Sequence, residues 1–344
     1  MAGNLRQSPR RHKPRAAQDA VAARGVRPAP SRARVRWAPS VYKRRAMPNA
    51  PLRPGDRVAV VSPSSPSDPA QLTEGIARWA ACCSISNDPR PFSRKGFLAG
   101  DDSLRGGALV EAVRDHTVRA VLAARGGYGA ARVLEGHGEA LREALRDDPK
   151  PLVGFSDITA LHALWSLAGA RSVHGPMVAA VGRGASLEEV RAVLCGAVPE
   201  AWTGLEVWRG GEARGVARGG NLAVLASLLG TPWAMDLDGA VLLLEDVSEA
   251  PYRLDRMLTS LRLSGALRGV RAVVLGEFTG CDARADGVSA DEVLRERLGD
   301  LGVPVLARAP FGHGATHRAW VQGAPVRVTA DGALVHDEGV SSAR

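Results

Sequence analysis

The chain has 344 residues, 45% of them hydrophobic, which is enough to bury the cores of two domains. Its four cysteines are too few for a disulfide scaffold and lack C-x-x-C spacing, so we expect reduced core thiols. No apolar run approaches the ~20 residues of a membrane span, and no apolar N-terminal secretory segment is present, so we expect a cytoplasmic protein. The net charge of +9 resides in residues 1–46, which hold thirteen Lys or Arg and one acid, whereas the remainder carries −3 and has no excess positive charge with which to bind nucleic acid.

Residues 1–46 are rich in Pro, Ala and Arg and show no hydrophobic period, which predicts a disordered basic tail. The tail is either a basic interaction arm or a product of a mis-annotated start, with Met47 as the true first residue. We favour Met47, because the first strand pattern begins only about ten residues later.

From Arg57 the chain alternates short apolar runs with amphipathic stretches, a rhythm typical of βαβ units. The expected strands, some with their following loops, are 57–65, 118–129, 151–155 and 172–176, and the expected helices are 71–82, 103–115 and 157–169. The pattern predicts that residues 52–185 form an open parallel sheet with helices on both faces. Because ligands bind at the carboxyl ends of such strands, the loops SPSSPSD, RGGYG, GFSD and HGPM are expected to meet at one rim.

Residues 186–205 are expected to link this domain to a second one, and they begin with a helix over 186–197. The second domain, residues 206–335, contains predicted strands over 240–246 and 270–278 and a predicted helix over 251–265 with one apolar face. Its final segment, 306–328, is Gly-rich and short-stranded. The pattern indicates a smaller mixed α/β, barrel-like domain, and the overall class is α/β.

Ser156 lies in KPLVGFSDIT, where a buried strand turns directly into a helix. A serine at such an elbow has its hydroxyl held out, and the helix N-terminus offers backbone N–H groups to a developing oxyanion. Gly154 fits the motif G-x-S-x-G, but Ile158 replaces its second glycine. The alternative is that Ser156 or Asp157 only caps the helix.

The loop RGGYG (125–129) could supply a second oxyanion donor from a glycine N–H, because backbone approaches a substrate closely where Cβ is absent. Its spacing departs from the dinucleotide motif G-x-G-x-x-G, since position 132 is Arg. The loop is therefore weak support for a nucleotide site.

A nucleophilic serine needs a base, and the chain offers eight histidines. Five of them are poor candidates. His12 lies in the tail, and His162 points away from the serine on the serine's own helix. The others lie among charged or helical residues: His116, His137 and His336. Of the other three, His313 lies between two glycines that let its loop fold into a cleft, and His174 ends a strand at the serine's rim. His313 is the first candidate and His174 the runner-up, and His317 follows in the same loop as His313.

The best orienting acid is Glu245, which ends an apolar strand in VLLLEDVSEAPY and can be buried beside an imidazole. Asp246 and Glu249 are near alternatives.

Taken together, these segments resemble the LD-carboxypeptidase family of serine peptidases, which includes the microcin C self-immunity peptidases. The resemblance runs in collinear order from Leu52 to Val326 through PGDRVAVVSPS, FLAGDDSLR, RGGYG, GFSDITALH, HGPM, GGNLAVLASLLGTPW, LLLEDVSEAPYRLDRML and GHGATHRAWVQG. It implies a catalytic triad and two backbone oxyanion donors. The triad falls on Ser156, Glu245 and His313, and the donors on Asp157 and Gly127.

The resemblance further implies a flavodoxin-like N-terminal domain, a smaller C-terminal domain, a site between them and a homodimer. We expect no metal and no cofactor, because the cysteines and histidines lack ligand spacing. The implied substrate is a small muropeptide, the murein tetrapeptide. The enzyme would cleave its bond between meso-diaminopimelate and the terminal D-Ala during peptidoglycan recycling. The alternative is a self-immunity peptidase that cleaves a microcin C-like peptidyl-nucleotide, and a distant one is a nucleotide- or nucleic-acid-binding protein. A carboxypeptidase also needs a group for the terminal carboxylate, and we expect an arginine that the sequence does not single out.

Overall fold

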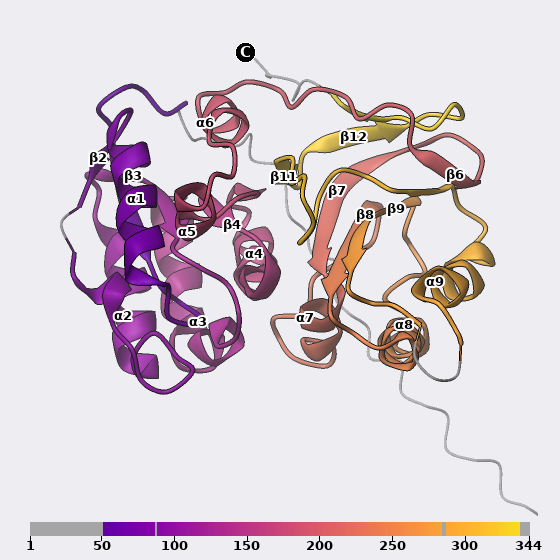
Figure 1. Cartoon of the computed structure of the whole chain (residues 1–344), viewed down its shortest axis with the longest axis horizontal. Helices are drawn as coiled ribbons and strands as arrows, with labels where there is room; N and C mark the ends of the chain where they lie inside the picture. Colours follow the sequence, from indigo (N-terminus) through magenta and orange to yellow (C-terminus); the bar gives the residue numbers. More distant parts are fainter. Residues whose placement is uncertain (1–50, 87, 284–286, 338–344) are drawn as a thin grey trace, which may run out of the picture. The chain divides into compact units, whose positions relative to one another are not determined.

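A computed structural model describes residues 51–86, 88–283 and 287–337 (Figure 1). The predicted tail, 1–46, and Met47 lie outside the described residues. The described residues belong to one compact unit that contains two β-sheets. No helix in these ranges is both long and apolar enough to cross a bilayer.

The first sheet has six strands in the order β11-β5-β4-β3-β1-β2. Its strands are β1 (Arg57–Val61), β2 (Ser84–Ile85), β3 (Val118–Ala123), β4 (Leu152–Gly154), β5 (Ser172–His174) and β11 (Trp320–Gln322). Strands β1 to β5 pair in parallel in the 2-1-3-4-5 order of flavodoxin-like sheets, which confirms the predicted fold class. β11 pairs antiparallel with β5, so a segment from the end of the chain completes this sheet.

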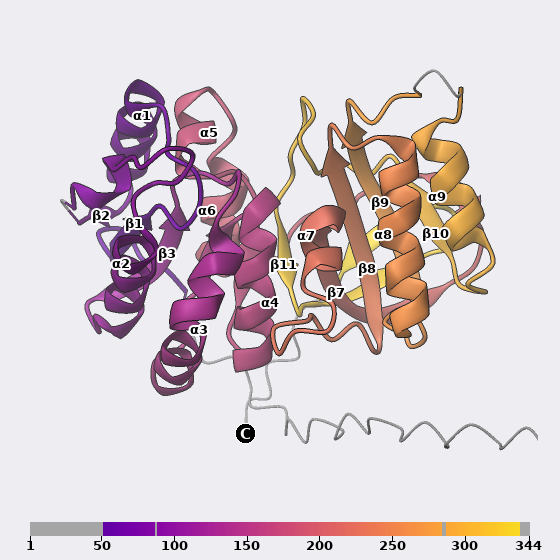
Figure 2. The same ribbon diagram turned by 90° about the horizontal axis from the view of Figure 1, so that it is seen from below.

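Helices cover both faces of the first sheet (Figure 2). One face packs against α1 (Pro69–Ala80), α5 (Val178–Gly182) and α6 (Glu188–Leu194), and the other against α2 (Asp102–Arg114), α3 (Ala130–Asp147) and α4 (Thr159–Ala168). The predicted helices over 71–82, 103–115 and 157–169 are confirmed within a few residues at each end. α3 and α5 had no prediction, and short 3-10 turns precede α2 (η1, Arg90–Phe92) and α4 (η2, Ser156–Ile158).

The second sheet has seven strands in the order β13-β12-β7-β8-β9-β10-β6. Its strands are β6 (Glu206–Arg209), β7 (Ala213–Asn221), β8 (Ala240–Val247), β9 (Ala272–Thr279), β10 (Val305–Ala307), β12 (Pro325–Val328) and β13 (Leu334–His336). The inner strands β7, β8, β9 and β10 are parallel, and antiparallel strands flank them. The helices of this part are α7 (Leu222–Ser227), α8 (Pro251–Ser264) and α9 (Ala290–Gly299), which together with the sheet confirm a mixed α/β second part.

One continuous hydrophobic core joins the two sheets. It includes Leu161 and Leu164 of α4, Leu225 of α7 and Leu244 of β8, all nearly or wholly buried. Burial of this kind fixes β4, which leads to Ser156, relative to β8, which carries Glu245. The division into domains at 186–205 stays a prediction.

The cysteines are free, as expected, but not all lie in the core. Cys83 and Cys281 are buried, whereas Cys195 is exposed just after α6. The prediction of a core thiol is therefore wrong for Cys195, because it lies on the exposed side of the helix end whose other side buries Val193 and Leu194. Cys82 is only half-buried.

Candidate active site

Ser156 occupies a strained turn between β4 and α4. Its φ of 62° lies in the left-handed region, which residues with a Cβ seldom adopt. Two residues earlier, a Cβ at Gly154 would lie 2.8 Å from Cγ2 of Ile158, so only glycine fits beneath that side chain. The turn therefore accommodates Ile158 in place of the motif's second glycine, because Gly154 has no Cβ to collide with the Ile158 side chain.

The capping alternative for Ser156 and Asp157 is wrong, because neither η2 nor α4 has a side-chain cap. The buried Asp157 carboxylate instead accepts hydrogen bonds from Ser64 Oγ at 2.6 Å and from the backbone N–H of Ala130, at the start of α3, at 2.8 Å. Burial raises the pKa of Asp157 above its ordinary value, although these bonds and the charge of Arg105 oppose the rise. Asp157 thus ties the elbow to the loops that follow β1 and β3.

The RGGYG loop lies directly against Ser156. A Cβ at Gly126 would lie 3.0 Å from the Ser156 Cβ and 3.3 Å from its Oγ. Gly127 has a φ of 108°, and a Cβ there would lie 2.5 Å from Ser65 Oγ. Within the described ranges, the backbone N–H groups of Gly127 and Asp157 have no hydrogen-bond acceptor. Both N–H groups therefore keep an unused hydrogen-bond donor beside Ser156 in this part of the chain.

Glu245 and His313 form a hydrogen-bonded pair. The Glu245 side chain is completely buried at the end of β8, and its Oε2 lies 2.6 Å from His313 Nδ1, while the His313 side chain is 19% exposed. Burial lowers the pKa of His313, but the hydrogen bond and charge of Glu245, aided by Asp246, outweigh it and raise that pKa above its ordinary value. When Nδ1 donates to Glu245, Nε2 is left to accept a proton.

The imidazole of His313 stands beside the elbow. Its ring centroid lies 4.9 Å from that of Phe155, the residue before Ser156. Among the described residues, however, no hydrogen bond joins the Ser156 hydroxyl to His313. Catalytic hydrogen bonds are often long in unliganded enzymes and tighten when substrate binds.

The other two candidate histidines have different surroundings. His317 Nδ1 donates to the carbonyl of Gly312 at 2.5 Å, and its ring stacks on that of His174 with centroids 5.2 Å apart. Burial lowers the pKa of His317 to about 4 and that of His174 well below its ordinary value. Both rings are therefore neutral at pH 7, and no carboxylate of the described residues bonds to either.

The alternative acids are engaged elsewhere. Asp246 accepts hydrogen bonds from the Asn221 side chain and from the Ala223 backbone, each at 2.9 Å, and burial raises its pKa to about 6. Glu249 pairs with Arg253 at 3.5 Å. Of the three carboxylates considered from the sequence, Glu245 is the one bonded to an imidazole.

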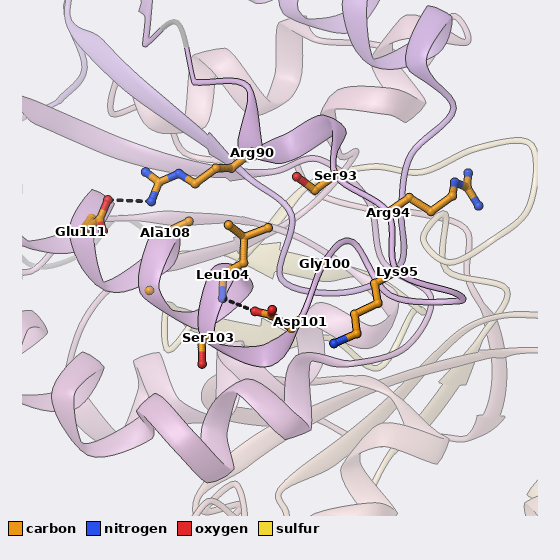
Figure 3. A pocket seen from close by; sticks show the side chains of 11 residues that line it. Arg90, Ser93, Arg94, Lys95, Gly100, Asp101, Ser103, Leu104, Ala108 and Glu111 are labelled. Atoms are coloured by element: carbon orange, nitrogen blue, oxygen red, sulfur yellow. Dashed lines mark hydrogen bonds and ion pairs between the residues drawn. The ribbon is translucent and has the colours of Figure 1, made fainter.

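A separate surface pocket opens beside the start of α2 (Figure 3). Its Arg90 pairs with Glu111 at 2.7 Å, and Asp101 accepts the Leu104 N–H at 2.8 Å. The pocket shares no lining residue with the site around Ser156. In the part of the chain that the structure describes, no group of three His, Cys, Asp or Glu side chains is arranged to hold a metal ion.

Family models match both parts of the chain. The LD-carboxypeptidase N-terminal domain matches residues 58–175, and the LD-carboxypeptidase C-terminal domain matches residues 214–328. The chain belongs to the LD-carboxypeptidase family. The expected resemblance is thereby confirmed, and the protein is a serine carboxypeptidase.

Relatives and solved structures agree with this assignment. A putative carboxypeptidase of Synechocystis is 40% identical over 289 residues, which cover 82% of this chain and 94% of the relative. The crystal structure of muramoyltetrapeptide carboxypeptidase from Oxalobacter formigenes is 28% identical, with a TM-score of 0.70 over 82% of this chain and all of the other. The microcin C7 self-immunity protein MccF is 20% identical, with a TM-score of 0.75 over 85% of this chain and 99% of the other, and shares the fold.

Sequence reasoning missed two supporting parts of the site. The Asp157 bond to Ser64 joins residues far apart in the sequence, and nothing in SPSSPSD singles out its second serine. Phe155 contacts the rings of His174, His313 and His317, although it looked like an ordinary strand residue. Its place one residue before the elbow serine was the one available signal.

Proposed function

We propose that the protein hydrolyses the amide between the L-centre of meso-diaminopimelate and the terminal D-Ala of murein tetrapeptide, with Ser156, His313 and Glu245 as its triad. The carboxypeptidase activity follows from the family, and the muramoyltetrapeptide substrate of the Oxalobacter relative supports this choice of peptide. The observation that carries the triad is the buried Glu245–His313 hydrogen bond beside a serine held at positive φ.

In the first half of the reaction, His313 Nε2 takes the Ser156 proton as Oγ attacks the amide carbonyl. The backbone N–H groups of Asp157 and Gly127 stabilise the negative oxygen of the tetrahedral intermediate. The C–N bond then breaks, and the proton on Nε2 passes to the leaving amine of D-Ala. An ester between the tripeptide and Ser156 remains.

In the second half, His313 removes a proton from water, and the resulting hydroxide attacks the ester. The second tetrahedral intermediate expels Ser156, which regains its proton from His313, and the tripeptide leaves. Throughout, Glu245 accepts the Nδ1–H bond and stabilises the charged imidazole.

Incubation with tetrapeptide, followed by mass spectrometry, tests this proposal. We expect tripeptide and free D-Ala in equal amounts from the wild type and none from Ser156→Ala. A tetrapeptide that ends in L-Ala is the matched control and should stay intact. Cleavage of a peptidyl-nucleotide with no tetrapeptide turnover would favour the self-immunity role instead, and cleavage of neither would contradict the proposal.

The expected homodimer also stays a prediction. Sedimentation velocity on the full chain would test it independently of activity.

A further inference from the structure

A carboxypeptidase must recognise the free carboxylate beside the bond it cuts. In the proposed reaction this carboxylate sits on the terminal D-residue, whose nitrogen is the leaving group. A guanidinium suits it, because its planar N–H groups can bind both carboxylate oxygens. The side chain must be anchored close to Ser156 and must not already be neutralised by an acid.

Arg125 is anchored at the required place. It follows the end of β3 by two residues and directly precedes Gly126, which lies against Ser156. Arg125 is exposed although both of its neighbours in the chain are buried. Its side chain therefore leaves the backbone at the rim where the scissile bond must lie.

The Arg125 guanidinium is held but not neutralised. Nη1 donates to the carbonyl of Pro66 at 2.8 Å, and the preceding residue, Ser65, packs against Gly127 of the expected oxyanion site. Among the described residues no carboxylate pairs with Arg125. Because a guanidinium carries five N–H donors, most of them remain for a ligand.

Four other arginines that the structure describes near the site pair with acids. Arg105 is buried, pairs with Asp102 and donates to the Gly129 carbonyl at 2.9 Å. Arg132 pairs with Asp102 as well, at 2.6 Å. On the His313 side of the site, the paired arginines are Arg318 with Glu189 at 2.9 Å and Arg253 with Glu249 at 3.5 Å.

We propose that Arg125 binds the C-terminal carboxylate of the departing D-residue and so makes the enzyme an exopeptidase. The Pro66 carbonyl fixes one side of the guanidinium, and the free side receives the carboxylate. This inference rests on the proposed function, because it places the leaving residue next to Ser156. It adds the residue that discriminates a free C-terminus from a blocked one.

The experiment compares tetrapeptide with a free terminal carboxylate and the same tetrapeptide ending in D-Ala amide, for the wild type and Arg125→Gln. We expect the wild type to prefer the free acid. In Arg125→Gln, kcat/KM for the acid should fall about 10- to 100-fold, the usual worth of a charge-assisted hydrogen bond, while kcat/KM for the amide stays within about threefold. Arg125→Lys should recover part of the preference.

The matched control is Arg119→Gln, which removes an exposed arginine from the opposite end of the same strand and should change neither substrate. Labelling of Ser156 by a fluorophosphonate reports whether each variant remains folded. If the wild type cleaves the acid and Arg125→Gln keeps the full preference, this inference is overturned and the proposed function stands. If the wild type cleaves neither substrate, both fall.

Discussion

Ser156 and His313 are held in place by two different kinds of structure. Ser156 sits in the strained turn between β4 and α4, and its neighbour Asp157 accepts buried hydrogen bonds from Ser64 and from the Ala130 backbone. His313 sits in an irregular loop whose position depends on tertiary contacts: Glu245 on one side, and Glu277 beneath Gly314. The proposed nucleophile is thus held by a strand-to-helix turn and several buried hydrogen bonds, and the proposed base by its hydrogen bond to one buried carboxylate, so the two halves should respond differently to mutation and to pH.

The largest expected effect comes from removing a triad member. We predict that Ser156→Ala, His313→Ala and Glu245→Gln each lower kcat about 10⁴-fold or more in a folded protein, because the three act as one unit. Steady-state kinetics with tetrapeptide measures this, and circular dichroism checks the fold. His317→Ala and His174→Ala are the controls and should lose far less, partly through stability. A dead His174→Ala beside an active His313→Ala would show that the triad is misassigned.

A glycine change on the nucleophile side should have the next largest effect. Gly127→Ala places a methyl group 2.5 Å from Ser65 Oγ at a φ of 108°, so the loop must move and carry the N–H away from the proposed oxyanion site. Loss of one such donor typically costs on the order of 10²-fold in kcat. Gly55→Ala is the matched control, because it also has positive φ but no heavy atom within 4 Å of its Cβ. Equal losses in the two variants would argue for general backbone strain.

On the base side, the sharper probe is pH. The pKa of His313 is raised above the ordinary 6.5, and the imidazole must be neutral to act as a base. In a plot of kcat/KM against pH, the rising part of the curve (the acidic limb) should therefore have an apparent pKa above 6.5. Glu245→Gln removes the charge that raises this pKa, and the limb of its residual activity should shift to lower pH. An unchanged apparent pKa in Glu245→Gln would indicate that another group titrates in this pH range.

The raised pKa of His313 also makes the stability of the folded protein depend on pH. A histidine whose pKa is raised by folding adds stability that is fully present below pH 6.5 and is lost as pH rises through the folded-state pKa. The difference in Tm between wild type and His313→Gln should therefore shrink from pH 6 to pH 9. A constant difference would mean that His313 contributes only packing.

The smallest expected effect is that of chelation. The proposed mechanism uses only side chains and backbone N–H groups, so exhaustive EDTA treatment should leave turnover unchanged. A strong loss restored by zinc would contradict a serine mechanism.

The contrast between the two halves also explains what could be predicted from the sequence. The parallel sheet, helices α1, α2 and α4 and the elbow follow from local periodicity, and the structure confirms them, whereas α3 and α5 had no prediction. Local pattern singles out His313 and Glu245 separately, but their contact bridges a loop and a strand 68 residues apart, and the family resemblance is what implies it. Nothing in local pattern encodes the path of β11, which crosses to the first sheet and pairs with β5.

Covalent labelling of Ser156 tests the central pairing of nucleophile and base most directly. The protein is treated with a fluorophosphonate, digested, and mapped by peptide mass spectrometry. We predict one phosphonyl group on Ser156, added much more slowly in His313→Ala and at the wild-type rate in Arg119→Gln. A label on Ser64 or Ser65 in place of Ser156, or undiminished labelling in His313→Ala, would contradict the assignment.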